Sequence, residues 1–200
     1  MGLLPRTAET AIWSSCGNSA QNKLAMAQLV EAGVLTSVKV GEKAQGTREG
    51  YPYYMLTSTL DLLDAPLPPP RMIFLGPLDS MLWDRKTLRH IFDFDYIWEV
   101  YKPEQLRKWG YYVLPVFYGD RFVARIDSRL EKGVWTISRW WWEADVTPDA
   151  EMLDALRVAS ENFTRYLRAS DVQVADGVDV AVKQAIVRDL APARGATTCQ

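Results

Sequence analysis

The first stretch of the chain with a clear periodicity lies between residues 18 and 32. Its apolar residues recur at helical spacing, at Ala20, Leu24, Ala27 and Val30. Asn18 stands where an N-cap residue is expected, and Gly33 follows at the position of a helix C-cap. The pattern predicts a helix over residues 18–32.

Two strand patterns follow this helix. Apolar and polar residues alternate over residues 34–40, a polar loop covers residues 41–50, and residues 51–56 have the composition of a second strand. Helix, strand, loop and strand in this order are typical of the second half of a winged helix. A shorter segment over residues 8–13 could supply a preceding helix, but the usual first helix is missing or displaced. We therefore expect an incomplete winged-helix-like module over residues 1–64.

A proline-rich segment separates this module from the rest of the chain. Residues 65–70 read Ala-Pro-Leu-Pro-Pro-Pro. Proline lacks the amide hydrogen that a helix interior or a central strand needs, so this segment predicts a stiff extended linker. We place the domain boundary there.

Short aromatic and β-branched runs follow the linker. They cover residues 72–75, 96–101, 111–118, 122–127 and 134–142. Turn signals separate several of them: Gly119-Asp120 is a candidate two-residue hairpin, and Glu131-Lys132-Gly133 is a second turn. The pattern predicts an antiparallel sheet curled into a small β-barrel, and hence an α+β fold for the whole chain.

The chain ends in helical patterns. Thr147-Pro148 suits an N-cap and first turn, and Arg165 and Arg168 lie near the end of the helix that would follow. A last strand is expected over residues 172–174 and a last helix over residues 180–190. The barrel domain with its C-terminal helix would then span residues 71–190, and residues 191–200 would form a tail.

Charge narrows the part of the chain that could touch a polyanion. The net charge of −2 argues against a strongly basic, non-specific nucleic-acid binder. The charges are unevenly spread, however. Residues 71–142 hold twelve Lys and Arg against nine Asp and Glu, whereas residues 143–200 hold six against ten. The middle of the chain is the better candidate.

The rest of the composition excludes several classes of protein. Cys16 and Cys199 have no close cysteine or histidine partner, so neither a disulfide framework nor a metal site is expected, and a reducing, cytoplasmic compartment fits best. No run of about 18 apolar residues occurs, so we expect no membrane span. We expect no cofactor.

Several motifs in the middle of the chain resemble one known family. They are Phe74–Arg85 (FLGPLDSMLWDR), Phe92-Asp93-Phe94 with Tyr96, Gly110–Pro115, Gly119-Asp120-Arg121 and Ala124–Asp127. In this order they resemble the C-terminal half of the winged-helix crosslink-repair DNA glycosylases of the YcaQ/AlkZ type, over residues 8–190. The resemblance implies tandem winged helices and a C-terminal β-barrel around duplex DNA, damaged DNA included. It also implies a nucleoid-associated protein, which we expect to be a monomer.

The catalytic motif of that family is absent from the chain. Family members hydrolyse the N-glycosidic bond with a Gln-x-Gln or Gln-x-Asp motif, yet none of the seven glutamines here is followed two residues later by Gln or Asp. The chain is therefore expected to be a truncated copy or a self-standing, non-catalytic DNA-binding protein. A non-enzymatic winged-helix DNA-binding or protein-interaction module stays open as the alternative.

Candidate DNA contacts follow from the expected elements. The predicted helix over residues 18–32 would present Gln21, Asn22 and Lys23 to base edges or phosphates, unless these are ordinary solvated helix residues. Arg48, like Lys43, would contact phosphate from the loop between the strands, but neighbouring glutamates weaken that signal. Remaining candidates are Arg85, Lys86 and Arg89 on one helical edge, and Lys102 and Lys108, with Arg107, beside a loop. For Arg85, an ion pair with Asp84 that orients a packed Trp83 is the commoner role of such a trio.

No catalytic residue is assigned. In Trp140-Trp141-Trp142 the outer two residues would share one strand face, and core packing is favoured over base stacking. His90 is the only histidine, which excludes a His-based triad and favours a structural role. The candidate carboxylates are Asp79, Asp84, Asp120 and Asp127, of which Asp84 and Asp120 have simpler structural explanations.

Overall fold

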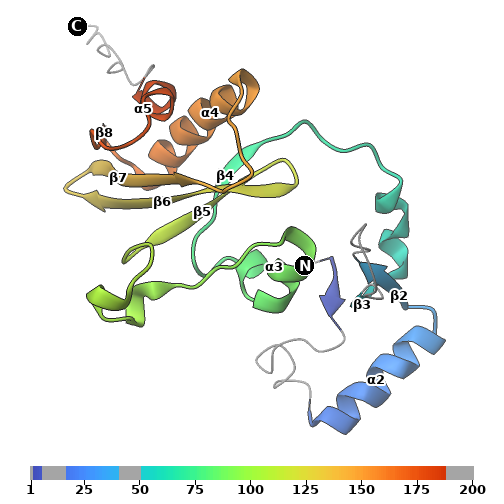
Figure 1. The fold of residues 1–200 in the computed structure, drawn as a ribbon. Helices are drawn as coiled ribbons and strands as arrows, with labels where there is room; N and C mark the ends of the chain where they lie inside the picture. Colours follow the sequence, from blue (N-terminus) through green and yellow to red (C-terminus); the bar gives the residue numbers. More distant parts are fainter. Residues whose placement is uncertain (1, 6–16, 41–50, 188–200) are drawn as a thin grey trace, which may run out of the picture. The chain divides into compact units, whose positions relative to one another are not determined.

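The computed structural model describes residues 2–5, 17–40 and 51–187 (Figure 1). The chain divides into two compact units. Unit 1 comprises Met1–Pro68 and Leu78–Tyr96, and unit 2 comprises Pro69–Pro77 and Ile97–Gln200. The first division falls inside the proline-rich segment, and the chain then returns to unit 1 for one further segment.

Unit 1 contains the predicted helix. Helix α2 covers Ser19–Glu31, and Asn18 caps it by accepting a hydrogen bond from the Gln21 amide at 3.0 Å. The Gln21 side chain accepts one from the Asn18 amide in return, which completes a capping box. Gly33 closes the helix with a φ of +70°, a conformation that glycine adopts without a steric cost. The predicted helix is confirmed.

A three-stranded sheet follows the helix. Strands β2 (Leu35–Val40) and β3 (Tyr51–Leu56) pair antiparallel, as the alternating pattern predicts. Strand β1 (Leu4–Pro5) pairs with the other edge of β3, a strand that the sequence pattern did not predict. The expected helix over residues 8–13 and the loop over residues 41–50 lie outside the described residues.

The segment after the linker completes unit 1. A short 3₁₀ helix covers Ser80–Leu82, and helix α3 covers Arg85–Phe92. Leu82 and Leu88 are buried together with Tyr53 of β3, whose hydroxyl lies 3.2 Å from the Nδ1 atom of His90. His90 therefore has the structural role that its place in the sequence favours.

Unit 2 is built on a five-stranded sheet. Its strands are β4 (Met72–Phe74), β5 (Val113–Tyr118), β6 (Arg121–Glu131), β7 (Val134–Trp142) and β8 (Asp171–Val174), in that order across the sheet. Strands β4 to β7 form an antiparallel meander, and both predicted hairpin turns are present. The antiparallel part of the barrel prediction is confirmed.

Two details of the barrel prediction are wrong. In the described part of the chain the sheet is open, with β4 and β8 at opposite edges, and β8 pairs parallel with β7. Helix α4 (Ala150–Leu167) connects β7 to β8 and carries the chain back along the sheet, so the next strand runs parallel. The strand predicted over residues 96–101 is also wrong, since Glu99–Tyr101 forms a 3₁₀ helix.

Helices α4 and α5 (Val180–Val187) cover one face of this sheet (Figure 1). The core between them contains Ile126, Trp135, Leu156 and Val182, all at most 1% exposed. The buried apolar area of this layer is the main stabilising contribution to unit 2.

The bounds of the two helices differ slightly from the predicted ones. Asp149, not Thr147, is the N-cap of α4, because its carboxylate accepts a hydrogen bond from the Met152 amide at 2.8 Å. Arg168 is the C-cap, with a φ of +55°. The predicted tail and the last three residues of the predicted final helix lie outside the described residues.

Candidate nucleic-acid interface

The sheet face of unit 2 that points away from α4 carries both arginine and tryptophan. Arg125 of β6 is paired with Trp141 of β7, and Asp127 with Arg139. Because directly paired residues share a face and alternate residues point to opposite faces, these four lie on one face. Trp140 points the other way and packs against the core, as its position in the triplet predicts.

Trp109 lies over this face. Its ring centroid is 5.4 Å from that of Trp141 in an edge-to-face arrangement, and the Arg125 guanidinium is 4.7 Å from the Trp109 ring centroid. Arg125 is only 4% exposed, and its Nε donates to Glu143 Oε1 at 2.7 Å. A buried guanidinium that is paired with a carboxylate and packed on the Trp109 ring is a rigid support for the loop that carries Trp109.

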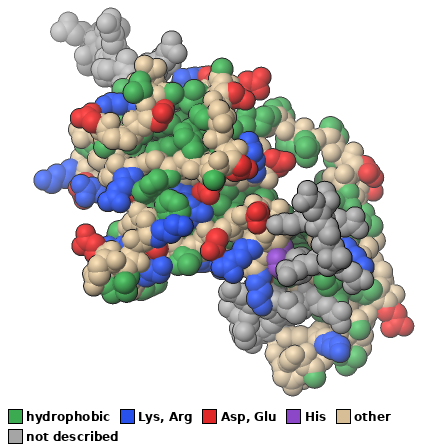
Figure 2. All heavy atoms as spheres, viewed as in Figure 1, with side chains coloured by type: hydrophobic (Ala, Val, Ile, Leu, Met, Phe, Trp, Pro, Cys, Tyr) green, Lys and Arg blue, Asp and Glu red, His purple; other side chains and the backbone are tan. Residues whose placement is uncertain are grey.

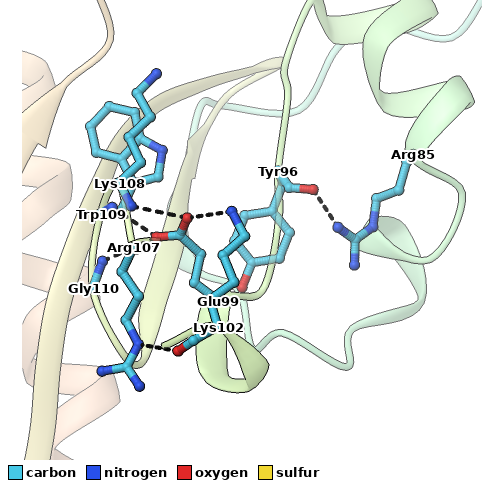
Figure 3. A network of polar contacts seen from close by, with 8 residues as sticks. All are labelled: Arg85, Tyr96, Glu99, Lys102, Arg107, Lys108, Trp109 and Gly110. Carbon is cyan, nitrogen blue, oxygen red and sulfur yellow. Dashed lines mark hydrogen bonds and ion pairs between the residues drawn. The ribbon is translucent and has the colours of Figure 1, made fainter. Parts of the chain in front are cut away.

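A single buried carboxylate holds that loop (Figure 3). Glu99 Oε1 accepts hydrogen bonds from the Lys102 ammonium at 2.9 Å and from the Lys108 amide at 3.1 Å. Glu99 Oε2 accepts from the amides of Trp109 at 2.8 Å and Gly110 at 3.3 Å. Four donors therefore converge on one side chain that is 4% exposed.

The hydrogen bonds decide the ionisation of this carboxylate. Burial alone raises the pKa of Glu99, but the Lys102 ammonium and the three backbone amides outweigh it and lower the pKa to about 2. Glu99 is therefore ionised at neutral pH. The folded loop and the negative charge stabilise each other.

The loop displays cations beside the sheet face. Arg107 donates from Nε to the Lys102 carbonyl at 2.9 Å, and its guanidinium lies 4.9 Å from the Tyr111 ring centroid. The Lys108 ammonium lies 4.7 Å from the Trp109 ring centroid. In Figure 2, Lys and Arg side chains gather beside strands β5 to β7 and over the segment of residues 97–112. We call Arg107, Lys108, Trp109, Arg125, Arg139 and Trp141 the basic–aromatic face.

Asp127 lies at the margin of this face. Burial raises the pKa of its carboxyl, while Arg139 and Arg129 act in the opposite direction. Gly110 packs against it: a Cβ atom at residue 110 would lie 2.8 Å from Asp127 Oδ2. Only glycine lets the loop approach the strand this closely.

The residues predicted on the first helix lie at the start of α2, in unit 1. The Gln21 side chain completes the capping box, and the Asn22 side chain donates to the Gly17 carbonyl at 3.4 Å. Lys23 is exposed. The first two side chains thus have local roles, and Arg48 lies outside the described residues.

The basic residues predicted on one helical edge lie on α3, also in unit 1. Arg85 donates to the Tyr96 carbonyl and lies 5.3 Å from the Tyr96 ring centroid (Figure 3). Arg89 donates twice to Asp95 Oδ1, at 2.7 and 3.0 Å, whereas Lys86 is exposed. Of the residues predicted beside the loop, Lys108 and Arg107 belong to the basic–aromatic face, and Lys102 is bonded to Glu99 in the same loop.

The alternative reading of Trp83-Asp84-Arg85 is wrong in one respect. Trp83 is 56% exposed rather than packed, and its Nε1 donates to the Leu78 carbonyl at 2.9 Å. Asp84 caps α3 by accepting from the amides of Lys86 and Thr87, both at 3.0 Å. Asp79 caps the preceding 3₁₀ helix by accepting from the Met81 amide at 2.9 Å, so both carboxylates have structural roles.

Arg125, Arg139, Trp109 and Trp141 are the members of the face that sequence reasoning did not select. The signal was present in the alternation along the strands, since residues 125, 127 and 129 share a face, as do 139 and 141. No such pattern indicated Trp109, because this residue lies in a loop and not on a strand.

Residues 2–5, 17–40 and 51–187 contain no group of three or more His, Cys, Asp or Glu side chains that could hold a metal ion. Among the same residues, none of the helices has the length and apolar character needed to cross a membrane.

Comparison with known proteins identifies the family of this chain. The model of the family described as "DNA glycosylase AlkZ-like" matches residues 4–169. The chain therefore belongs to the AlkZ-like DNA glycosylase family, which confirms the family predicted from its motifs; that it corresponds to the C-terminal half stays a prediction.

One solved structure is similar to the chain. It is the Streptomyces sahachiroi DNA glycosylase AlkZ, with 13% sequence identity and a TM-score of 0.44. The match covers 82% of this chain and 38% of that protein. The chain thus matches well under half the length of its solved relative.

Proposed function

We propose that this chain binds DNA through the basic–aromatic face and does not release a base by itself. One observation carries the proposal: Glu99 fixes a loop that carries the cations Arg107 and Lys108, and Trp109 of the same loop packs on Arg125 and Trp141. Cations attract the phosphates, and fixed cations lose little entropy on binding. Membership of a glycosylase family supports DNA as the polyanion.

The absence of base release is inferred from the sequence. Hydrolysis of the N-glycosidic bond needs a group that activates water, and in the glycosylases that the chain resembles a Gln-x-Gln or Gln-x-Asp motif does this. None of the seven glutamines has that spacing. The proposal therefore separates DNA binding, which the face supports, from catalysis.

A titration of the purified chain with a fluorescent duplex at two salt concentrations tests the proposal. The duplex is used intact and with an alkylated or abasic site, and the same tubes are assayed for released base. We expect salt-dependent binding without release. Binding without any salt dependence, or no binding, would contradict the proposal, and base release would overturn its non-catalytic part.

Matched variants assign the binding to the face. Arg107→Gln with Lys108→Gln removes two charges from it, whereas Arg165→Gln with Lys183→Gln removes two from helices α4 and α5, on the opposite side of the sheet. If both cations contact phosphates, the slope of log K against log salt falls by about 2 in the first pair only. An equal decrease of the salt slope in both double variants would show that DNA does not bind specifically at the basic–aromatic face.

We propose that unit 1 is a partial winged helix that presents α2 to DNA. Because the Gln21 and Asn22 side chains are engaged locally, Lys23 is the contact that this proposal rests on most. Lys23→Ala should then weaken duplex binding and lower the salt slope by about 1. Unchanged affinity and slope would remove α2 from the interface.

One observation favours a second candidate function, that of a protein-interaction module. Helix α2 has no buried residue among those described, and Leu24 is 61% exposed. Leu29 and Val30 of the same helix are 40% and 37% exposed, and several exposed apolar side chains on one helix are typical of a surface that a protein partner covers. Leu24→Asp would leave DNA affinity unchanged and abolish concentration-dependent self-association or partner capture under this candidate; a loss of DNA affinity alone would contradict it.

A further inference from the structure

Four aromatic side chains surround the Glu99-held loop in unit 2. Tyr101 is 86% exposed, Tyr111 is 55% exposed and Tyr112 is 42% exposed. Trp98 lies between two of them, with ring centroids 5.7 Å from Tyr101 and 6.2 Å from Tyr112, both edge-to-face. We call Trp98, Tyr101, Tyr111 and Tyr112 the tyrosine platform.

The tyrosine platform is ordered by the same carboxylate as the basic loop. Trp98 directly precedes Glu99, and Tyr101 lies in the 3₁₀ helix that Glu99 begins. Tyr111 follows Gly110, whose amide donates to Glu99. Glu99 therefore restrains both ends of the segment that carries the rings. The rings are exposed on a loop whose backbone is fixed by these hydrogen bonds.

Exposed rings of this kind are poorly explained by folding alone. A tyrosine that is 86% exposed contributes little apolar burial to the core. Aromatic rings bring large contact area at a small entropy cost when they bind, because they have few rotatable bonds. The tyrosine platform therefore contributes little to the stability of unit 2 but offers a large contact area to a bound partner.

The charges beside the platform indicate which partner it fits. The Arg107 guanidinium lies over the Tyr111 ring, and Lys102 and Lys108 flank the same segment. Exposed aromatic faces beside cations are the combination that binds single-stranded nucleic acid, in which rings stack on bases and cations contact the backbone. In a paired duplex the base faces are covered by their neighbours, so the rings cannot reach them.

We propose that the tyrosine platform stacks on unpaired bases, so that the chain binds single-stranded or locally unpaired DNA more tightly than paired DNA. This inference rests on the proposed DNA-binding function and deepens it. The cations of the basic–aromatic face supply the sequence-independent attraction, and the rings add a preference for unpaired strands.

Fluorescence anisotropy with three DNA probes of equal length tests the preference: a mixed-sequence single strand, the matching duplex, and the duplex with a short unpaired loop. The expected order of affinity is single strand and looped duplex above paired duplex, by about tenfold or more. Equal affinity for the three, or tighter binding to the paired duplex, would overturn the platform while leaving the DNA face in place. No binding to any probe would overturn the proposed function itself.

Tyrosine variants separate stacking from charge. Tyr101→Ala removes an exposed ring and should weaken single-strand binding roughly 5- to 100-fold, with the salt slope and the duplex affinity unchanged. Tyr166→Ala is the matched control, since that ring is 79% exposed on α4. A loss that is equal for duplex and single strand would contradict stacking. Trp98→Phe gives a second readout: it should remove part of any fluorescence quenching caused by the single strand.

Discussion

Glu99 combines burial, full ionisation and four hydrogen-bond donors in one side chain. Three of its donors are backbone amides nine to eleven residues further along the chain, so the carboxylate replaces the regular hydrogen bonding that this loop lacks. The loop geometry therefore depends on a single charge. That dependence makes Glu99 a positioning residue for both the basic–aromatic face and the tyrosine platform.

Glu99→Gln should destabilise unit 2 by about 2–3 kcal/mol, because the amide of glutamine removes the charge and points a donor at backbone donors. The neighbouring Glu104→Gln is the control and should change stability by less than about 0.5 kcal/mol, since Glu104 is exposed. Chemical denaturation at neutral pH measures both. Equal stability of the two variants would contradict the role of the Glu99 carboxylate in holding the loop.

The same residue predicts an acid transition. Because folding lowers the pKa of Glu99 from 4.5 to about 2, its ionisation stabilises the fold fully above pH 4.5. That contribution is lost as the pH falls from about 4.5 towards 2. The difference in unfolding free energy between the wild type and Glu99→Gln should shrink across this window. A difference that stays constant from neutral pH to pH 2 would be inconsistent with an ionised, paired Glu99.

Gly110 is the second residue on which the loop depends, for a steric reason. In Gly110→Ala the new methyl group would lie 2.8 Å from Asp127 Oδ2 and 3.2 Å from a Val113 methyl carbon, so the Asp127 side chain or the loop must shift. We expect a loss of about 1–3 kcal/mol in thermal or chemical unfolding. Gly76→Ala, where no atom lies within 4 Å, is the matched control. Adding Asp127→Ala to Gly110→Ala should recover part of the loss if the clash is its cause.

At the scale of elements, sequence patterns predicted most of the helices, strands and turns that depend on neighbouring residues. The helix after Asn18, the strands β2 and β3 and the two hairpins of unit 2 depend on neighbours in sequence, through capping, alternation and turn residues. Their positions were therefore readable from the sequence. The N-cap of α4 was placed two residues early because Thr147 and Asp149 both suit that role.

The segment after Tyr96 was predicted wrongly for the opposite reason. Its aromatic and β-branched residues have strand composition, but its conformation depends on a side chain that bonds to amides far along the chain. No local pattern records such a contact. The same limit hides Trp109, whereas Arg125 and Trp141 followed from alternation and could have been selected together.

The β6–β7 hairpin offers a test of turn chemistry. Lys132 and Gly133 both have positive φ, +49° and +81°, which is the conformation of a type I′ turn. Lysine adopts it at a steric cost, whereas asparagine is well suited to it. Lys132→Asn should stabilise the protein by about 0.5–1 kcal/mol, and Lys132→Val should destabilise it. Melting temperatures of the three proteins check this, and a stabilising valine would refute it.

At the scale of the whole molecule, the two units are not joined by one simple linker, because the chain passes between them more than once. The proline-rich segment predicted one boundary, and the first division at Pro68 falls within it. Leu78–Tyr96 nevertheless belongs to unit 1, while the flanking Pro69–Pro77 and Ile97–Gln200 belong to unit 2. Gly76-Pro77 stands directly before the start of this return, whereas no proline or glycine marks its end between Tyr96 and Ile97.

The return has a direct consequence for fragments of the protein. A fragment that begins at Pro69 keeps Leu82, Leu88 and Tyr96 but loses Tyr53, the buried partner from β3. These side chains are at most 2% exposed in the intact chain, so the fragment would expose a new apolar surface. We expect it to bind a hydrophobic dye and to aggregate more readily than the full chain.

Replacing Leu78–Tyr96 in that fragment with a short Gly/Ser linker should restore a soluble unit 2, because the remaining segments contain its whole core. Circular dichroism, dye binding and a cooperative melt compare the three proteins. If the simple fragment from Pro69 is as well folded as the version with the linker, the segment has no need of unit 1 and the division of the chain must be redrawn at residue 69. If only the version with the linker folds, isolated unit 2 can be titrated with DNA. DNA binding by the basic–aromatic face is then measured in the absence of α2 and α3.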